Sequence, residues 1–573
     1  MKRVALFLAC FALIAFAARP SAMIPEQVRI DTGMLEGVTG TVHPTVRIFK
    51  GVPFAAPPLG ENRWKAPQPA AKWDGVFKAN AFGPSCTAGG GRGGGGGARG
   101  AAPGRGGAPG APGAAAPAAP PQAAAPAAPP RQPAASEDCL TVNIWTNAAR
   151  ANDRRPVMVW IYGGGFTGGS GGMAWYDGED LAAKGAVIVT MNYRLGALGF
   201  FSHPELAKES GRNASGNYGM MDAIGALQWV KRNIAAFGGD PNNVTIFGES
   251  AGAIMIGALV GSPAAKGLFN RAISESGAWM GLQMGRMTPG EQAMGAGAKA
   301  MEAAGIKTIA ELRAKPLSEL PNLGGGGLII DGYIIPEDLS ITFASGRQND
   351  VDVLAGSNKD ENTFFGGGGG RGGGGRGGRG GGDAAAPAPG AAVQAYVAQA
   401  KTRYGDLADT FLKLYPAETD ADVPLMNAAA QNDEINWNMR QFAEKASKTG
   451  KKGYSYFFTR VPLRNGQPQP NGATHTAEIS YVFNHPYSNG ALEWNDVDRK
   501  LGDQMSSYWV NFATKGDPNG AGLPAWPQLK DLSKDKVIVL GDTVQVEASV
   551  PAEKLAFFNA RYARLMKTPT GTN

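Results

Sequence analysis

The chain has 573 residues and a formal net charge of +7, but most of that positive excess is local. Ten lysines and arginines lie in the first 22 residues or in Gly/Ala/Pro/Arg-rich tracts, and without them the remaining chain carries a formal charge of −3. A nearly neutral body gives no reason to expect a nucleic-acid partner, and no later stretch has the roughly 18 uninterrupted apolar residues of a membrane span.

The N-terminus has the pattern of a secretory signal peptide. Lys2 and Arg3 precede an apolar run over residues 4–17, which ends in the small-x-small sequence Ala15-Phe16-Ala17. We therefore expect residues 1–22 to be a signal peptide that directs export to the periplasm or the medium. The alternative is a lipoprotein signal acylated on Cys10, which we disfavour because only six apolar residues of the run precede it.

Cysteine usage agrees with export. Removing the signal would leave only Cys86 and Cys139, in an oxidising compartment. We predict a disulfide between them; two free buried thiols are the alternative.

Composition divides the chain into a folding part and two inserts. Short alternating β-type runs with prolines over 24–87 predict an antiparallel edge with loops. Residues 88–136 and 366–392 consist almost wholly of Gly, Ala, Pro and Arg, which cannot bury enough apolar surface to fold. Their Arg-Gly-Gly strings resemble RNA-binding segments, but in an exported protein we favour solvated loops. The rest, 23–565, is predicted to be one domain, followed by a tail, 566–573.

The periodicity between the inserts is that of an α/β protein. Apolar runs of strand length alternate with helical patterns, notably over 222–236 and 497–512. Such runs predict buried strands in a mostly parallel central sheet that helices flank on both faces. The expected strands are 156–162, 186–192, 244–247, 272–276, 351–355, 454–458 and 536–540.

A nucleophile elbow is predicted at the end of one of these strands. Val244–Phe247 lead into Gly248-Glu249-Ser250-Ala251-Gly252, and an apolar helical segment follows. Small residues on both sides let strand and helix approach while the serine is held in a strained turn. Ser250 is the predicted nucleophile, and the N–H of Ala251 would face the substrate oxyanion.

A serine needs a base and an acid, which in this architecture follow it in the chain. The histidines after Ser250 are His475, in a loop of small residues, and His485, which precedes a proline. We predict His475 as the base. Asp360 and Glu361 both follow the strand 351–355 closely enough to be the acid, and spacing alone does not choose between them.

Oxyanion donors are predicted from a second motif. Gly163-Gly164-Gly165 follows the strand 156–162, and consecutive glycines let two backbone N–H groups turn toward one point.

In combination these motifs resemble the type-B carboxylesterase and cholinesterase family, whose fold is the α/β-hydrolase fold. The resemblance covers most of residues 25–560 outside the inserts. It is carried by Phe49–Ala55, Ser136–Trp145, Tyr162–Phe166, Asn192–Gly196, Gly239–Pro241, the elbow and Gly516–Pro518.

The family's site residues map onto positions of this chain. The resemblance implies that Glu361 is the acid and His475 the base, and that Ser276 supports the acid. It places the oxyanion donors on Gly164, Gly165 and Ala251. It also implies a disulfide between Cys86 and Cys139 and an ion pair between Arg63 and Glu137.

Two departures from the family pattern bear on function. Asn362 stands where the family has glycine after the acid, and the tract between the cysteines has no aromatic residue. A quaternary-ammonium substrate is therefore not expected, because the stacking ring is missing. We predict an exported serine carboxylesterase that needs no metal or cofactor. The alternative, a non-catalytic adhesion relative, would normally lack the serine or the histidine.

Overall fold

The computed structural model describes residues 23–86, 135–277, 287–361, 390–464, 466–486, 493–531, 534–547 and 551–566. The predicted signal peptide, the greater part of both Gly/Ala/Pro/Arg-rich tracts, nearly all of the predicted tail and Asn362 lie outside these ranges.

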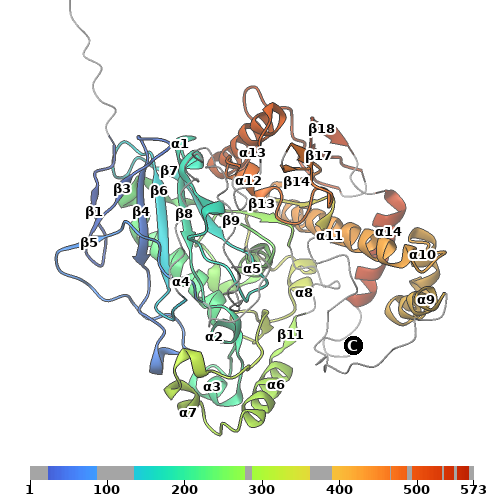
Figure 1. Cartoon of the computed structure of the whole chain (residues 1–573), viewed down its shortest axis with the longest axis horizontal. Helices are drawn as coiled ribbons and strands as arrows, with labels where there is room; N and C mark the ends of the chain where they lie inside the picture. The colour runs from blue at the N-terminus through green and yellow to red at the C-terminus, as the bar shows by residue number, and fades with distance from the viewer. Residues whose placement is uncertain are drawn as a thin grey trace, which may run out of the picture.

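An 11-stranded sheet runs through the molecule (Figure 1). All neighbours from β8 to β17 are parallel, and antiparallel pairs close both edges. The strands in spatial order are β18 (Val544–Glu547), β17 (Val537–Leu540), β14 (Gly453–Phe458), β13 (Asp352–Asn358), β10 (Arg271–Glu275), β9 (Gly239–Glu249), β7 (Arg155–Ile161), β8 (Val187–Met191), β6 (Thr141–Thr146), β4 (Arg47–Pro53) and β3 (Val38–Thr39).

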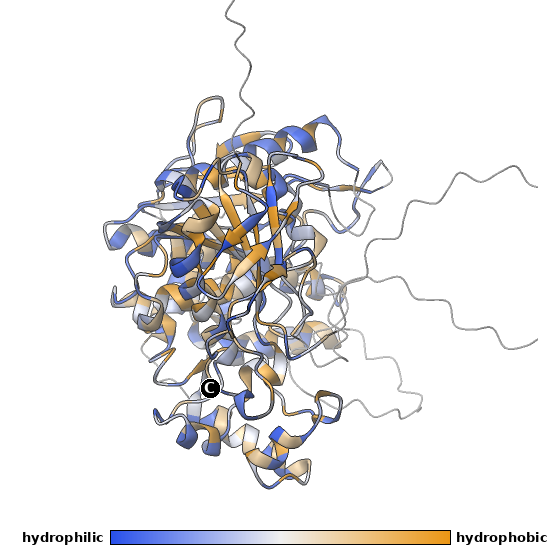
Figure 2. Ribbon diagram, turned by 90° about the vertical axis from the view of Figure 1, so that its left-hand side faces the viewer, coloured by the Kyte–Doolittle hydropathy of each residue, from blue (hydrophilic) through white to orange (hydrophobic). Residues whose placement is uncertain are grey.

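The seven predicted strands are confirmed as β7, β8, β9, β10, β13, β14 and β17. Nearly every residue of β7 and β8 is buried, because helices cover both faces of a parallel sheet and neither face meets water. Figure 2 shows the resulting concentration of hydrophobic residues along the central strands.

The predicted antiparallel N-terminal edge is confirmed with one exception. β1 (Gln27–Arg29) and β2 (Met34–Glu36) pair antiparallel in a small separate sheet, as do β3 and β4 in the main sheet. However, β5 (Val76–Lys78) joins β2 in parallel, because the proline-rich connection carries the chain back before it pairs.

Fourteen α-helices are described, and the two predicted from periodicity are confirmed as α4 and α13. The helices are α1 (Glu179–Ala183), α2 (Gly196–Phe200), α3 (Pro204–Glu209), α4 (Tyr218–Asn233), α5 (Ala251–Gly261), α6 (Gly290–Ala303), α7 (Ile309–Ala314), α8 (Leu339–Ala344), α9 (Ala391–Tyr404), α10 (Ala408–Leu414), α11 (Asp422–Lys448), α12 (Ile479–Val482), α13 (Asp496–Lys515) and α14 (Ala552–Leu565). No helix in the described ranges is both long and apolar enough to cross a membrane.

Adjacent residues of β9 show how the sheet is covered from two sides. Side chains alternate between the faces of a strand. Gly248 faces α5, where an added Cβ would lie 3.2 Å from Ile256. Phe247 faces the other way and packs on Phe483, just after α12, with ring centroids 5.7 Å apart.

The predicted disulfide between Cys86 and Cys139 is present, and both residues are fully buried. Beside it, Arg63 donates from Nε and Nη2 to the two carboxylate oxygens of Glu137, at 2.7 and 2.6 Å. This buried ion pair is the one that the family resemblance implied.

Candidate active site

The predicted elbow has the strand–turn–helix order that its sequence requires. β9 ends at Glu249, α5 begins at Ala251, and Ser250 between them has φ 56° and ψ −125°. An added Cβ would lie 2.2 Å from the carbonyl oxygen of Ile161 at Gly248, and 1.9 Å from the same atom at Gly252. Only glycine fits at these two positions, because β7 passes directly against the turn.

The glycine run after β7 lies against the elbow. A Cβ on Gly163 would lie 2.8 Å from Cβ of Ser250, so the two backbones are in contact. Gly164 and Gly165 have φ of +107° and +61°, and the carbonyl of Gly164 accepts from the N–H of Gly168 at 3.1 Å. Positive φ at two successive residues turns their N–H groups away from the direction that an extended strand would give them. The N–H of Ala251, at the first position of α5, has no acceptor within the helix.

His475 is held between two carboxylates. Its side chain is almost fully buried, Nδ1 lies 2.5 Å from Oε2 of Glu361, and Nε2 lies 3.0 Å from Oε1 of Glu249. Because Glu249 immediately precedes Ser250, the Nε2 edge of the ring is directed at the elbow. Burial by itself disfavours the imidazolium, but the combined attraction of Glu249 and Glu361 raises the pKa of His475 well above its ordinary value.

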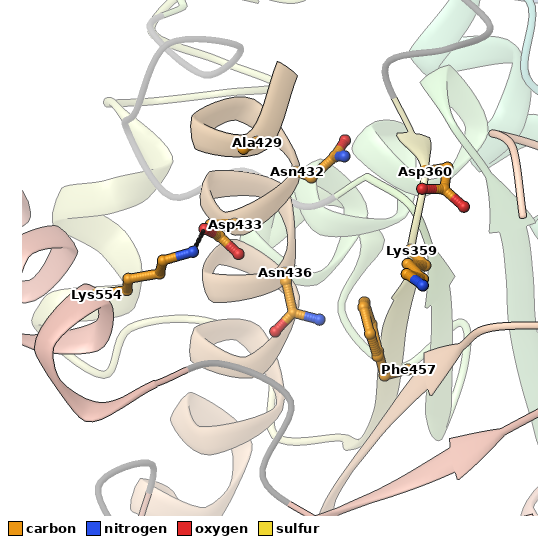
Figure 3. Close-up of a pocket in the computed structure, with 8 residues that line it drawn as sticks. All are labelled: Lys359, Asp360, Ala429, Asn432, Asp433, Asn436, Phe457 and Lys554. Atoms are coloured by element: carbon orange, nitrogen blue, oxygen red, sulfur yellow. Dashed lines mark hydrogen bonds and ion pairs between the residues drawn. The ribbon is translucent and has the colours of Figure 1, made fainter. Parts of the chain in front are cut away.

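Glu361, and not Asp360, is the carboxylate that the structure brings to His475. Glu361 is fully buried, and its second oxygen accepts the N–H of Asn358 at 2.7 Å. Asp360 instead accepts a hydrogen bond from the N–H of Ala473 at 2.8 Å. It also lines a separate pocket of about 280 Å³, whose other lining residues include side chains of α11 (Figure 3). Asp352 is the first residue of β13 and therefore lies at the opposite end of that strand from Glu361.

His485, the histidine not chosen, lies away from these carboxylates. It follows α12, its ring packs near Phe483 at 6.5 Å between centroids, and burial lowers its pKa although Asp177 opposes that effect.

Ser276 lies at the end of β10 with φ 55°. Its hydroxyl lies 3.5 Å from Oε1 of Glu478, the residue three positions after His475. Glu478 also accepts a hydrogen bond from the side chain of Asn358, whose backbone N–H binds Glu361. The predicted supporting serine therefore contacts a second buried carboxyl group, that of Glu478.

Sequence reasoning missed three buried glutamates of the site: Glu249, which faces His475, Glu478, and Glu275, which interacts with the other two. Burial raises the pKa of Glu249; burial and then Glu478 raise the pKa of Glu275 well above its usual range. Burial, followed by the charges of Glu249 and Glu361, raises the pKa of Glu478 to about 8. The sequence signal was their position, since each lies within three residues of a predicted site residue.

Among the described residues, no group of three or more His, Cys, Asp or Glu side chains is placed to hold a metal ion. The chemistry available at the elbow is that of a hydroxyl, an imidazole, carboxylates and backbone N–H groups.

Comparison with known proteins agrees with this geometry. The model of the carboxylesterase family matches residues 25–558. The fumonisin B1 esterase of Sphingopyxis macrogoltabida is 35% identical over 537 residues, covering 91% of this chain and 87% of that protein. The para-nitrobenzyl esterase of Bacillus subtilis is 30% identical over 546 residues, covering 92% and 97%.

Solved structures give the same result. A PNB esterase structure has a TM-score of 0.70 at 29% identity, and the carboxylesterase EST55 of Geobacillus stearothermophilus has 0.71 at 28%. Each comparison covers 93% of this chain and 99% of the other. The chain belongs to the carboxylesterase family. It has the α/β-hydrolase fold and is a carboxylic ester hydrolase.

Proposed function

We propose that this protein hydrolyses carboxylic esters through an acyl-enzyme formed on Ser250, with His475 as general base and Glu361 as the acid that orients it. The observation that carries the proposal is the position of His475, whose Nδ1 lies 2.5 Å from Glu361 while its Nε2 faces the elbow. This is the arrangement that fixes an imidazole in the tautomer able to accept the proton of a serine.

The reaction follows in two halves. Oγ of Ser250 attacks the ester carbonyl as its proton passes to Nε2 of His475, and the N–H groups of Gly164, Gly165 and Ala251 bind the oxyanion. Nε2 returns the proton to the departing alcohol, which leaves an ester on Ser250. Water then gives a proton to Nε2 and attacks that ester. Collapse of the second tetrahedral intermediate releases the acid and returns the proton to Ser250.

The proposal extends to location and substrate. The buried Cys86–Cys139 disulfide supports export, because such bonds persist in oxidising compartments. The predicted signal peptide, residues 1–22, supports the same proposal. We further propose that 23–565 act as one hydrolytic domain. The esters cleaved by the related para-nitrobenzyl and fumonisin B1 esterases set the first substrates to try.

A direct test is turnover of a short-chain p-nitrophenyl ester by the wild-type protein and by Ser250→Ala, together with labelling by a fluorophosphonate probe. Turnover and labelling that both disappear in Ser250→Ala support the proposal. A folded wild-type protein that neither turns over esters nor takes up the probe would favour a non-catalytic adhesion role.

A further inference from the structure

A second large cavity lies apart from the residues around Ser250. Its volume is about 570 Å³, and it opens between α3, α4 and the segment after the short 3₁₀ helix Gly60–Asn62. None of the residues of the elbow, the glycine run or the His475 loop line it. Its size is within the range of about 300–1,000 Å³ typical of small-molecule sites.

The floor of this cavity is apolar. Leu206, Tyr218, Ile224 and Ile334 are all buried in the protein yet line the cavity wall. Trp64 adds an aromatic side chain to the lining, and this side chain is fixed because its indole N–H donates to the carbonyl of Ala197 at 2.9 Å. A floor of this kind favours an aliphatic or aromatic ligand body through the area that the ligand removes from water.

Three charged side chains line the cavity: Lys65, Glu209 and Arg212. Lys65 and Glu209 are paired with each other at 3.4 Å, and Glu209 also accepts from Arg313 at 2.8 Å. These two groups therefore compensate one another and leave little charge for a ligand.

Arg212 differs from that pair. It is exposed, its guanidinium lies 4.3 Å from the ring centroid of Tyr333, and the ion pairs of the described residues include none with Arg212. A guanidinium that contacts an aromatic ring through its central carbon still has N–H groups to donate, and their geometry matches the two oxygens of a carboxylate.

We propose that this cavity is a second ligand site that binds an apolar monocarboxylic acid, with the hydrocarbon body against Trp64 and Tyr218 and the carboxylate on Arg212. Such acids are the class that carboxylic ester hydrolysis releases. The site would let the enzyme bind a product-type acid without occupying the elbow. The binding claim rests on the cavity alone, and it stands whether or not Ser250 is the nucleophile.

The test is calorimetric titration of the full chain with decanoate. Two variants probe the site: Arg212→Gln removes the charge, and Met221→Trp fills the cavity. The matched control is Arg29→Gln, which removes an exposed arginine of β1. Thermal unfolding without decanoate shows that each variant is folded.

We expect one decanoate site in the wild type and in Arg29→Gln. Binding should be about 10-fold or more weaker in Arg212→Gln, as expected for a charge-assisted hydrogen bond, and lost in Met221→Trp. Equal binding in Arg212→Gln and Arg29→Gln would overturn the carboxylate assignment. Unchanged binding in Met221→Trp, with competitive inhibition of ester turnover, would place the acid at the elbow and overturn the site. Heat of binding does not depend on turnover, so this result is separate from the test of Ser250.

Discussion

Oε2 of Glu361 lies 2.5 Å from Nδ1 of His475, and both side chains are removed from water. The other oxygen of Glu361 is fixed by the N–H of Asn358, so this carboxylate is held at both ends. Because its carboxylate partner is fixed, the imidazole of His475 keeps its orientation without help from the substrate.

Replacing this carboxylate should therefore slow the reaction with little change in shape. We expect Glu361→Gln to lower kcat by roughly 10³–10⁴, because the imidazolium loses its partner and the tautomer is no longer fixed. Steady-state turnover of a p-nitrophenyl ester measures the effect, and Glu553→Gln, an exposed change on α14, is the matched control. A loss below 10-fold would show that Glu361 is not the acid.

The second carboxylate, Glu249, should set the pH dependence. Glu249 stabilises the charged imidazole and so contributes to the raised pKa of His475. Glu249→Gln removes that stabilisation, the pKa of His475 falls, and the base is free at lower pH. We expect the acid limb of the pH profile of kcat/KM to move to lower pH in the variant. A limb that stays in place, or moves to higher pH, would contradict the assigned coupling.

Asp360 should act by positioning the His475 loop. Its carboxylate accepts the N–H of Ala473, two residues before the base, and the chain pairs as an isolated bridge between Asp360 and Thr474. We expect Asp360→Ala to lower kcat about 10-fold with KM nearly unchanged. The reason is the loss of one charge-assisted hydrogen bond, which contributes about 1.5 kcal/mol. Asp360→Asn keeps an acceptor and should restore most of kcat. Equal losses in both variants would indicate a different role.

Two glycine-to-alanine changes should have opposite effects on stability. At Gly252 a Cβ would meet the carbonyl oxygen of Ile161 at 1.9 Å, so the backbone must shift to make room. Gly252→Ala should therefore lower the free energy of unfolding by about 3 kcal/mol. Gly295 lies in α6 with no atom near an added Cβ, and Gly295→Ala should raise the free energy of unfolding by about 0.5–1 kcal/mol. Chemical denaturation measures both values. Similar effects at the two positions would refute the packing argument.

The sequence was informative where a local rule controls the structure. Buried parallel strands must be apolar throughout, so β7 and β9 were visible as apolar runs, and the elbow was visible because it requires glycine at 248 and 252. The order of residues along the chain also predicted His475 as the base, and the structure brings its ring to Glu361, just after β13.

What the sequence did not reveal depends on contacts between distant segments. The loop of His475 has the composition of an exposed turn, yet the ring is buried because the loop packs between β13 and the elbow. Nothing local indicates that Glu249 turns toward that ring or that Trp509 donates to Glu275 at 2.8 Å. Spacing could not separate Asp360 from Glu361. In the structure Asp360 forms a bridge with Thr474, a residue distant in the sequence, while Glu361 is fully buried against His475.

The disulfide between Cys86 and Cys139 fixes a position at which another domain can be inserted into the chain. Cα atoms of Cys86 and Cys139 lie 5.3 Å apart, and the N–H of Ser136 donates to the carbonyl of Ser85 beside them. The two ends of the segment 87–134 are thus joined by a covalent bond and a backbone hydrogen bond. A foreign domain whose own termini lie close together can replace that segment and leave the disulfide intact. This position is therefore a suitable site for inserting a second domain into an active esterase.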